Sequence, residues 1–347
     1  MAAGLRAGMP ETLIVRLPNW LGDTVMAVPA LRALRAGRAD ARVALVGPWA
    51  TLLAGQDLAD LLVPYPHSWV GRLARWDGLR ALEASTAILL PNSMEAALAA
   101  RYWRAQRRVG FDAGGRGWLL TDPVSRAAPR GHQVDQYLFL IERFGVSAGS
   151  RTPKLVAPPP ESAQRATARE LLRDAGVVGE GRGAVVGIQL GAAYGPSKLW
   201  PSARIADLCR GLRDVAGVPV LLGARDDVAV ARGLVDETGV ASLVGRDSPE
   251  LLTAILAELD ALVCGDTGVG HLAAALGTPV VALFGPTDPA RTAPRGTVRV
   301  IAHGVPCAPC FYRACPIDHP CLRGVGADEV HRALDEVLTS ARRGDCR

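Results

Sequence analysis

The chain has 347 residues, of which 49% are hydrophobic, and a formal net charge of +5. This length exceeds that of most single domains, so two domains of roughly 150 residues each are expected. The sequence has no uninterrupted apolar run of about 18 residues, and its start lacks the basic-then-apolar order of a secretory signal, so we expect a cytoplasmic protein. The modest positive charge favours acidic ligands or an anionic membrane surface, and it falls short of a nucleic-acid-binding composition.

The first half alternates predicted strands with predicted helices, which is typical of β-α-β units. The expected elements are a strand over 12–17, a helix over about 24–36, strands over 41–46 and 87–90, and helices over about 93–103 and 133–144.

A proline-rich segment over 152–162 separates the two halves. Proline lacks the backbone donor and fixes φ, so this segment cannot continue a helix or a central strand. We therefore expect an N-terminal domain over 1–157 and a C-terminal domain over 158–347.

The second half repeats the same alternation. The expected elements are strands over 184–190, 219–222, 243–244, 256–264 and 279–284, and helices over 201–216, 228–238, from Ser248, and over 271–276. Two Rossmann-like α/β halves with parallel sheets follow, and we expect them to face a central cleft. Open parallel sheets bind ligands beyond the carboxyl ends of their strands, and the candidate motifs all lie in loops that follow strands.

The stretch from Cys264 to His271 places a glycine-rich turn between a buried strand and a helix. The first turn of a helix carries unpaired N–H groups and a positive dipole end, so a phosphate is expected there. Gly268 and Gly270 are expected to leave room for a ligand, with Thr267 at the junction. Asp266 is a candidate hydroxyl acceptor. His271 is either a phosphate contact or a packed helix residue.

The same stretch also fits the pattern Gly-x-Gly-x-x-Ala at Gly268, Gly270 and Ala273, and Asp288 lies 20 residues beyond Gly268. This pattern leaves an NAD-dependent oxidoreductase open as an alternative. A nicotinamide-binding fold usually opens with such a unit, whereas here the unit closes the second half.

Three further loops carry candidate residues. Asp23 either caps the helix that follows it or serves as a base that accepts a proton from a sugar hydroxyl. Lys198 is one of only two lysines in the chain, and its ammonium group suits phosphate oxygens. Asp226 is a candidate acceptor for a ribose or nucleobase, although Asp226 or Asp227 is expected to cap the next helix.

Two features bear on metals. The chain contains no Asp-x-Asp, the simplest metal-diphosphate clamp, so Lys198 and backbone N–H groups are expected to meet the charge of a diphosphate. Four cysteines near the C-terminus, with His319 among them, allow either zinc binding or a loop of packed or disulfide-bonded thiols, and we assign no metal. These cysteines are Cys307, Cys310, Cys315 and Cys321.

A basic, aromatic segment over 101–108 is expected either to form a solvated helix face with its aromatic residues packed inward or to contact an anionic lipid or phosphorylated sugar. His67, Trp69 and Trp76 lie in preceding loops and are candidates for stacking on sugar rings.

Four segments together resemble glycosyltransferase family 9, the ADP-heptose:lipopolysaccharide heptosyltransferases, with the type II branch most similar. The segments are 13–23, 191–201, 266–271 and 284–289, in family order along nearly the whole chain; the cysteine segment is also similar to that branch. Where the type I branch carries hydroxyl residues, this chain has Ala193 and Tyr194, so donor contacts at these two positions are not carried over.

The resemblance implies a GT-B fold, with the acceptor mainly on the first domain and the sugar nucleotide mainly on the second. It implies ADP-L-glycero-D-manno-heptose as donor, heptosyl-Kdo2-lipid A inner core as acceptor, and no cofactor. The family's base falls on Asp23, its phosphate-binding lysine on Lys198, and its nucleotide-site residues on Asp266, Thr267, Gly268 and His271. Peripheral contact with the inner membrane and no nucleic-acid partner are expected.

Two functional alternatives stay open beside the oxidoreductase. Heptosyltransferase I or another family 9 enzyme would use a different acceptor, and a non-catalytic glycan-binding module would bind the acceptor without transfer. For the main interpretation we expect an inverting, metal-independent transfer in which Asp23 is the base.

Overall fold

The computed structural model describes residues 11–126, 131–177, 183–215, 217–246 and 248–343. The chain divides into two compact units, unit 1 over 1–151 and unit 2 over 152–347. The proline-rich segment therefore belongs to unit 2, where the amide of Leu155 donates to the carbonyl of Ala275. Each unit is described by itself.

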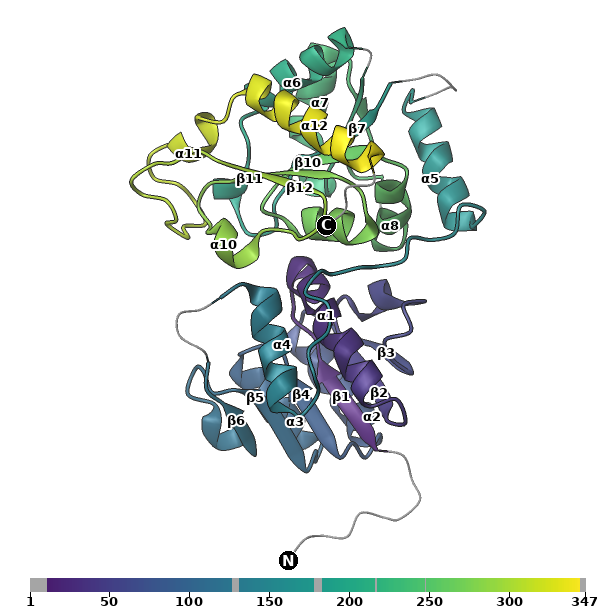
Figure 1. The fold of residues 1–347 in the computed structure, drawn as a ribbon, viewed down its shortest axis with the longest axis vertical. Helices are drawn as coiled ribbons and strands as arrows, with labels where there is room; N and C mark the ends of the chain where they lie inside the picture. Colours follow the sequence, from purple (N-terminus) through teal and green to yellow (C-terminus); the bar gives the residue numbers. More distant parts are fainter. Residues whose placement is uncertain (1–10, 127–130, 178–182, 216, 247, 344–347) are drawn as a thin grey trace, which may run out of the picture. The chain divides into compact units, whose positions relative to one another are not determined.

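The described part of unit 1 contains a six-stranded parallel sheet in the order β3-β2-β1-β4-β5-β6 (Figure 1). Its strands are β1 (Thr12–Arg16), β2 (Arg42–Gly47), β3 (Leu61–Pro64), β4 (Thr86–Leu89), β5 (Arg107–Phe111) and β6 (Asp122–Val124). Its helices are α1 (Leu21–Gly37), α2 (Trp69–Arg80), α3 (Met94–Tyr102) and α4 (Gln133–Arg143), with 3-10 turns η1 (Ala50–Leu53) and η2 (Gly117–Leu119).

Parallel strands that are covered on both faces consist of continuous apolar runs, and β1, β2 and β4 follow this rule. Helix α1 packs against α4, and α2 packs against α3. The alanine-rich buried side of α3 lies on the sheet with Ile14, Val46 and Leu89, which lets the helix approach the strands closely.

Unit 2 repeats this architecture within its described residues, with a parallel sheet in the order β12-β11-β10-β7-β8-β9. Its strands are β7 (Val185–Gln189), β8 (Val218–Leu222), β9 (Ala241–Ser242), β10 (Ala261–Gly265), β11 (Val280–Phe284) and β12 (Val298–Ala302). Its helices are α5 (Ala163–Asp174), α6 (Ser202–Asp214), α7 (Val228–Thr238), α8 (Pro249–Ala257), α9 (Gly268–Leu276), α10 (Pro289–Thr292), α11 (Pro320–Arg323) and α12 (Ala327–Arg342), with 3-10 turns η3 (Pro196–Lys198) and η4 (Arg225–Asp227).

Helix α12 packs on α6 and on the sheet through Val330, Leu334 and Val337, and closes the core of unit 2. Helix α5 packs on α8, and α8 packs on α9. Within the described residues, none of the helices combines the length and the hydropathy needed to cross a membrane.

Several expected boundaries were wrong. Helix α1 begins at Leu21 rather than Thr24, because the amide of Thr24 already donates to the carbonyl of Trp20. Strand β10 begins at Ala261, since residues 256–257 still belong to α8. Strand β9 lies at 241–242 rather than 243–244, and the chain turns at Gly245, whose φ is +76°.

Candidate functional site

Lys198 lies at the end of a loop that follows the central strand β7 of unit 2. Its ammonium group is 2.6 Å from Oδ2 of Asp266 and donates to the carbonyl of Asp266 at 3.0 Å. It also lies 4.6 Å from the centre of the Tyr194 ring, a cation–π distance. The side chains of Lys198 and Asp266 are only 10% and 8% exposed. The structure therefore joins two of the predicted site residues in a nearly buried ion pair.

Asp266 lies directly after β10 and is held from a second side. The hydroxyl of Thr287, in the loop after β11, donates to Oδ2 of Asp266 at 2.7 Å. Loops that follow β7, β10 and β11 thus converge on one carboxylate at the carboxyl edge of the sheet. Thr287 was missed as a site residue, although it lies in the loop after a correctly predicted strand.

Helix α9 begins beside this pair. Thr267 occupies the N-cap position with extended backbone dihedrals, and Gly268 is the first helical residue. His271 is buried within the first turn. The N–H groups of this turn and the dipole of the helix provide partial positive charge next to Lys198.

Two glycines here serve close packing. A Cβ on Gly265 would lie 2.7 Å from the carbonyl oxygen of Lys198, and one on Gly270 would lie 2.6 Å from Sγ of Cys264. Gly270 is therefore explained by the Cys264 thiol, whereas we expected it to leave room for a ligand. Burial raises the pKa of Cys264 to about 12, so this thiol stays protonated.

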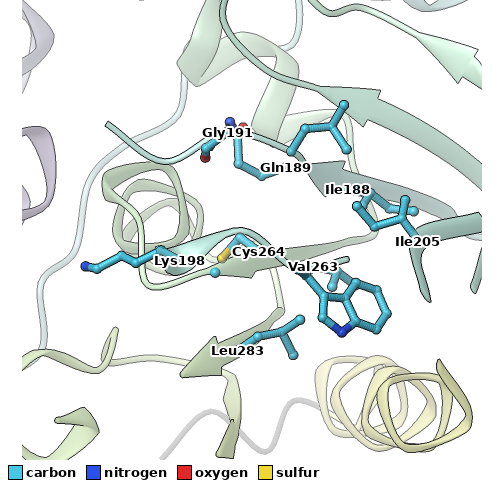
Figure 2. Close-up of a pocket in the computed structure, with 11 residues that line it drawn as sticks. Ile188, Gln189, Gly191, Lys198, Ile205, Val263, Cys264 and Leu283 are labelled. Atoms are coloured by element: carbon cyan, nitrogen blue, oxygen red, sulfur yellow. Dashed lines mark hydrogen bonds between the residues drawn. The ribbon is translucent and has the colours of Figure 1, made fainter. Parts of the chain in front are cut away.

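A small pocket lies under the Lys198 loop, lined by side chains of β7, β10, β11 and α6 (Figure 2). Figure 2 shows the Lys198 side chain extending away from the apolar residues Val263 and Leu283 of the lining. The lining also includes Trp200, whose indole N–H donates to the carbonyl of Val325. Trp200 therefore packs beneath the loop.

The cysteine segment lies against the Lys198 loop. The Tyr194 hydroxyl donates to the carbonyl of Phe311 at 2.6 Å, and the Ser197 hydroxyl donates to the carbonyl of Tyr312 at 2.6 Å. The positively charged guanidinium of Arg313 lies 5.5 Å from the centre of the Tyr194 ring. Gly195 has φ +148° and ψ 171°, and a Cβ there would lie 2.6 Å from the carbonyl oxygen of Arg313. Only glycine fits this backbone contact.

The cysteines themselves are free thiols in the described residues, and no group of three or more potential metal ligands is arranged around a common point there. Burial raises the pKa of Cys321, which packs against Gly285. The amide of His319 donates to Sγ of Cys315 at 3.2 Å. Of the four cysteines, Cys321 is thus packed in the core of unit 2, whereas Cys307 is exposed.

Asp226 and Asp227 differ in position. Asp226 is exposed, whereas Oδ2 of Asp227 accepts a hydrogen bond from the amide of Ala224 at 2.8 Å. Burial raises the pKa of Asp227, and the charge of Asp226 adds to this effect. A Cβ on Gly191 would collide with the Asp227 carboxylate, which therefore lies beside the start of the Lys198 loop. The expected side-chain cap of α7 was wrong: Asp227 occupies the N-cap position of α7 without a side-chain capping bond there, and its carboxylate instead accepts the Ala224 amide within the turn η4.

In unit 1, Asp23 lies in the first turn of α1, at the carboxyl end of the central strand β1. The N-cap position belongs to Trp20, so Asp23 is inside the helix, where the dipole favours a carboxylate. The hydroxyl of Tyr137 on α4 donates to Oδ1 of Asp23 at 3.5 Å. Burial raises the pKa of Tyr137, and the Asp23 charge adds to this, so the tyrosine is a neutral donor.

The basic, aromatic segment spans the end of α3 and the start of β5, so it is not one helix face. Trp103 is buried, and Tyr102 donates to Asp77 at 2.6 Å. Trp76 donates to the Tyr65 hydroxyl at 2.8 Å, whereas Trp69 is half exposed. His67 is exposed as well.

Two Rossmann-like units, the second with a lysine–carboxylate pair beside a helix N-terminus at its sheet's carboxyl edge, define the GT-B class expected from the sequence. The chain belongs to glycosyltransferase family 9 (heptosyltransferase), whose sequence profile matches residues 72–320, and it is therefore a glycosyltransferase.

The chain is 27% identical to lipopolysaccharide heptosyltransferase 2 of Escherichia coli K12 in an alignment of 349 residues that covers 94% of each protein. It superimposes on the structure of E. coli ADP-heptose lipopolysaccharide heptosyltransferase II with a TM-score of 0.78 and 24% identity, over 95% of this chain and 99% of the other. E. coli heptosyltransferase WaaC with ADP gives a TM-score of 0.69 and 18% identity, over 94% and 99% of the chains.

Because the chain belongs to this glycosyltransferase family, the NAD-dependent oxidoreductase alternative was wrong. Asp288, the acidic residue of the Gly-x-Gly-x-x-Ala pattern, instead caps α10, because its Oδ1 accepts a hydrogen bond from the amide of Ala290 at 3.0 Å.

Proposed function

We propose that this protein transfers heptose from ADP-L-glycero-D-manno-heptose to the heptosyl-Kdo2-lipid A inner core of lipopolysaccharide, with inversion at the anomeric carbon and without metal or cofactor. The relatives named heptosyltransferase 2, similar along nearly the whole chain, support this acceptor over that of heptosyltransferase I. The observation that carries the proposal is the Lys198–Asp266–Thr287 cluster at the start of α9.

The donor diphosphate would bind in unit 2. Lys198 would contact the phosphate oxygens, and the first N–H groups of α9, at Gly268 and Gly270, would contact them from the helix end. His271 and Thr267 lie in the same turn. Asp266 and the exposed Asp226 would accept hydrogen bonds from hydroxyl groups of the donor. As the glycosidic bond to ADP breaks, negative charge grows on the diphosphate, and these fixed donors would stabilise it.

The acceptor would be activated in unit 1. Asp23 would remove the proton from the acceptor hydroxyl while its oxygen attacks the anomeric carbon on the face opposite ADP. A carboxylate at a helix N-terminus is favoured in its charged form, which suits a base. The Tyr137 hydroxyl, fixed in its protonated state, would help to orient the Asp23 carboxylate through Oδ1.

The acceptor is anchored in lipid, and α2 offers a surface for peripheral contact with a membrane. We call this surface the α2 patch: Trp69, Val70 and Leu73 are 51%, 77% and 41% exposed, with Arg75 exposed beside them. Exposed apolar side chains next to arginine are typical of helices that lie on anionic bilayers.

Flotation with vesicles that contain anionic lipid tests the α2 patch. The double variant Val70→Ser/Leu73→Ser should lose vesicle binding, whereas Trp118→Ser, which removes an even more exposed tryptophan of unit 1, should keep it. Equal loss in both variants, or wild-type protein that does not float, would contradict the membrane contact.

The transfer itself is tested by incubating the pure protein with ADP-heptose and lipopolysaccharide truncated after the first heptose, with EDTA present, and following ADP release. Asp23→Asn should lower turnover by roughly 10²- to 10⁴-fold and leave ADP affinity within about twofold. Asp77→Asn is the matched control, since Asp77 also accepts a tyrosine hydroxyl in unit 1. Release that stops with EDTA would contradict metal independence, and binding without release would indicate a glycan-binding module.

A further inference from the structure

Arg16 is a charged side chain in the middle of the unit 1 core. It is the last residue of the central strand β1, and it is 0% exposed. Burial lowers the pKa of Arg16, and the nearby Glu95 carboxylate opposes this effect. A buried guanidinium costs several kcal/mol unless it is paired and hydrogen-bonded, and a well-packed apolar residue is often the more stable choice.

The guanidinium of Arg16 folds forward under the loop between β1 and α1. One Nη donates to the carbonyl of Leu17, and Nη2 donates to Oδ1 of Asn19 at 2.7 Å. The carbonyl of Asn19 accepts a further hydrogen bond from the indole of Trp49 at 3.2 Å. The loop is thus tied to the core four residues before Asp23.

The charge of Arg16 is balanced by Glu95 on α3. Glu95 lies 3.6 Å from Arg16 and 3.0 Å from Arg72, and it accepts the Tyr65 hydroxyl at 2.8 Å. The Tyr65 ring lies 4.5 Å below the Arg16 guanidinium. Arg72 also reaches Oδ1 of Asn19, at 3.5 Å. Residues from α2, α3 and the loop after β3 therefore hold one guanidinium in one orientation.

We propose that Arg16 is a positioning residue: through its bonds to Leu17 and Asn19 it fixes the loop that sets the place of Asp23 at the start of α1. The inference rests on the proposed role of Asp23 as the base. A directed pair of donors explains why the site holds an arginine, since packing alone would be served by an apolar side chain. Displacement of a reacting group by about 1 Å can lower a rate by about 100-fold.

The chain offers a matched control in Arg116, the other fully buried arginine of unit 1 in the described residues. It donates to the carbonyls of Pro91 at 2.6 Å and Ser93 at 3.1 Å, and so fixes the loop before α3. Arg16→Lys and Arg116→Lys both keep the charge and lose the two-pronged hydrogen bonding.

Kinetics of the full-length enzyme with ADP-heptose and truncated lipopolysaccharide test the proposal. Both lysine variants should lower the unfolding midpoint to a similar extent. Of the two variants, only Arg16→Lys should lower kcat, by roughly 10- to 100-fold. Its KM for the donor and its ADP affinity should stay within about twofold of the wild-type values. Equal kcat in the two variants, or a kcat for Arg16→Lys within twofold of wild type, would overturn the positioning role.

Asn19→Ala gives a second test that keeps Arg16 and its Glu95 partner in place and applies even if Arg16→Lys does not fold. It should lower kcat to a similar degree, and Arg16→Lys/Asn19→Ala should be no slower than the slower single variant, because both act through one bond. Additive losses, or a fast Asn19→Ala enzyme, would refute the inference. Wild-type turnover and the Asp23→Asn result separately show whether the proposed function and the base assignment hold.

Discussion

Substitutions in the Lys198–Asp266 pair should affect stability equally but ADP affinity differently. The two side chains are about nine-tenths buried and 2.6 Å apart. Removing one member of a buried ion pair leaves an uncompensated charge, at a cost of about 3 kcal/mol. Lys198→Met and Asp266→Asn should each destabilise unit 2 by this amount, which is a shift of about 9 °C in its unfolding midpoint.

The double variant Lys198→Met/Asp266→Asn should cost no more than either single change, because neither charge is then left alone. This corresponds to a coupling of about 3 kcal/mol in a double-mutant cycle. Additive losses would show that the pair contributes little and that each side chain acts through other contacts.

ADP affinity separates the two residues, and isothermal titration calorimetry measures it. Lys198→Met should weaken ADP by about 10- to 100-fold, because charge-assisted hydrogen bonds to the diphosphate contribute about 1.5 to 3 kcal/mol. Asp266→Asn should leave ADP affinity within about threefold, because the amide oxygen can still accept a hydroxyl hydrogen bond. The neutral side chain also no longer competes with the diphosphate for the Lys198 ammonium group.

The control is Arg165→Met, which removes one of the two arginines paired with the nearly buried Glu258 of unit 2. It should destabilise the unit less than Lys198→Met, because Arg169 still pairs with Glu258, and it should not change ADP affinity. If Asp266→Asn weakened ADP as much as Lys198→Met, the carboxylate would be a necessary ligand contact and the competition argument would be refuted.

Three further outcomes are expected. Thiol labelling of the native protein at pH 8 should modify exposed Cys307 and spare Cys264, whose burial raises its pKa to about 12, and equal labelling would contradict the buried site. Gly195→Ala should lower both the unfolding midpoint and ADP affinity, whereas Gly176→Ala, also at positive φ but in open space, should affect only stability, by roughly 1 kcal/mol. Burial raises the pKa of Asp227, so the stability of wild type relative to Asp227→Asn should fall as pH rises through the range in which this carboxyl titrates, and a rise would be the wrong sign.

The alternation of strands and helices in both units was predictable because buried parallel strands are continuous apolar runs that end at glycine, proline or aspartate. Helix α2 was missed because its exposed residues mix Trp69, Val70 and Leu73 with charged side chains, so apolar and polar residues do not separate clearly onto two faces. Strand β3 was missed because it is four residues long and lies at the sheet edge.

The candidate site was predictable where a loop follows a strand and carries a rare or charged residue, as with Lys198 and Asp266. Thr287 carries no such mark, since a threonine beside a proline is ordinary in a turn, and only the fold brings it to Asp266. Arg16 was read as part of a strand, because its function depends on Glu95 and Asn19, which the sequence alone does not place beside it.

The arrangement of charge in unit 2 has a consequence for turnover. With Asp266 as its partner, Lys198 brings no net positive charge to the edge of the sheet. The positive charge that remains there comes from the start of α9 and from Arg313. A diphosphate would then take the place of Asp266 as the partner of Lys198. The binding free energy would gain only the difference between the Lys198–diphosphate and the Lys198–Asp266 interactions. The same exchange would assist the reverse step, because Asp266 recaptures the ammonium group as ADP leaves. A transferase that uses a sugar nucleotide must release the nucleotide in every cycle, so a resting ion pair at the proposed phosphate site would favour repeated turnover over the tightest possible binding of ADP.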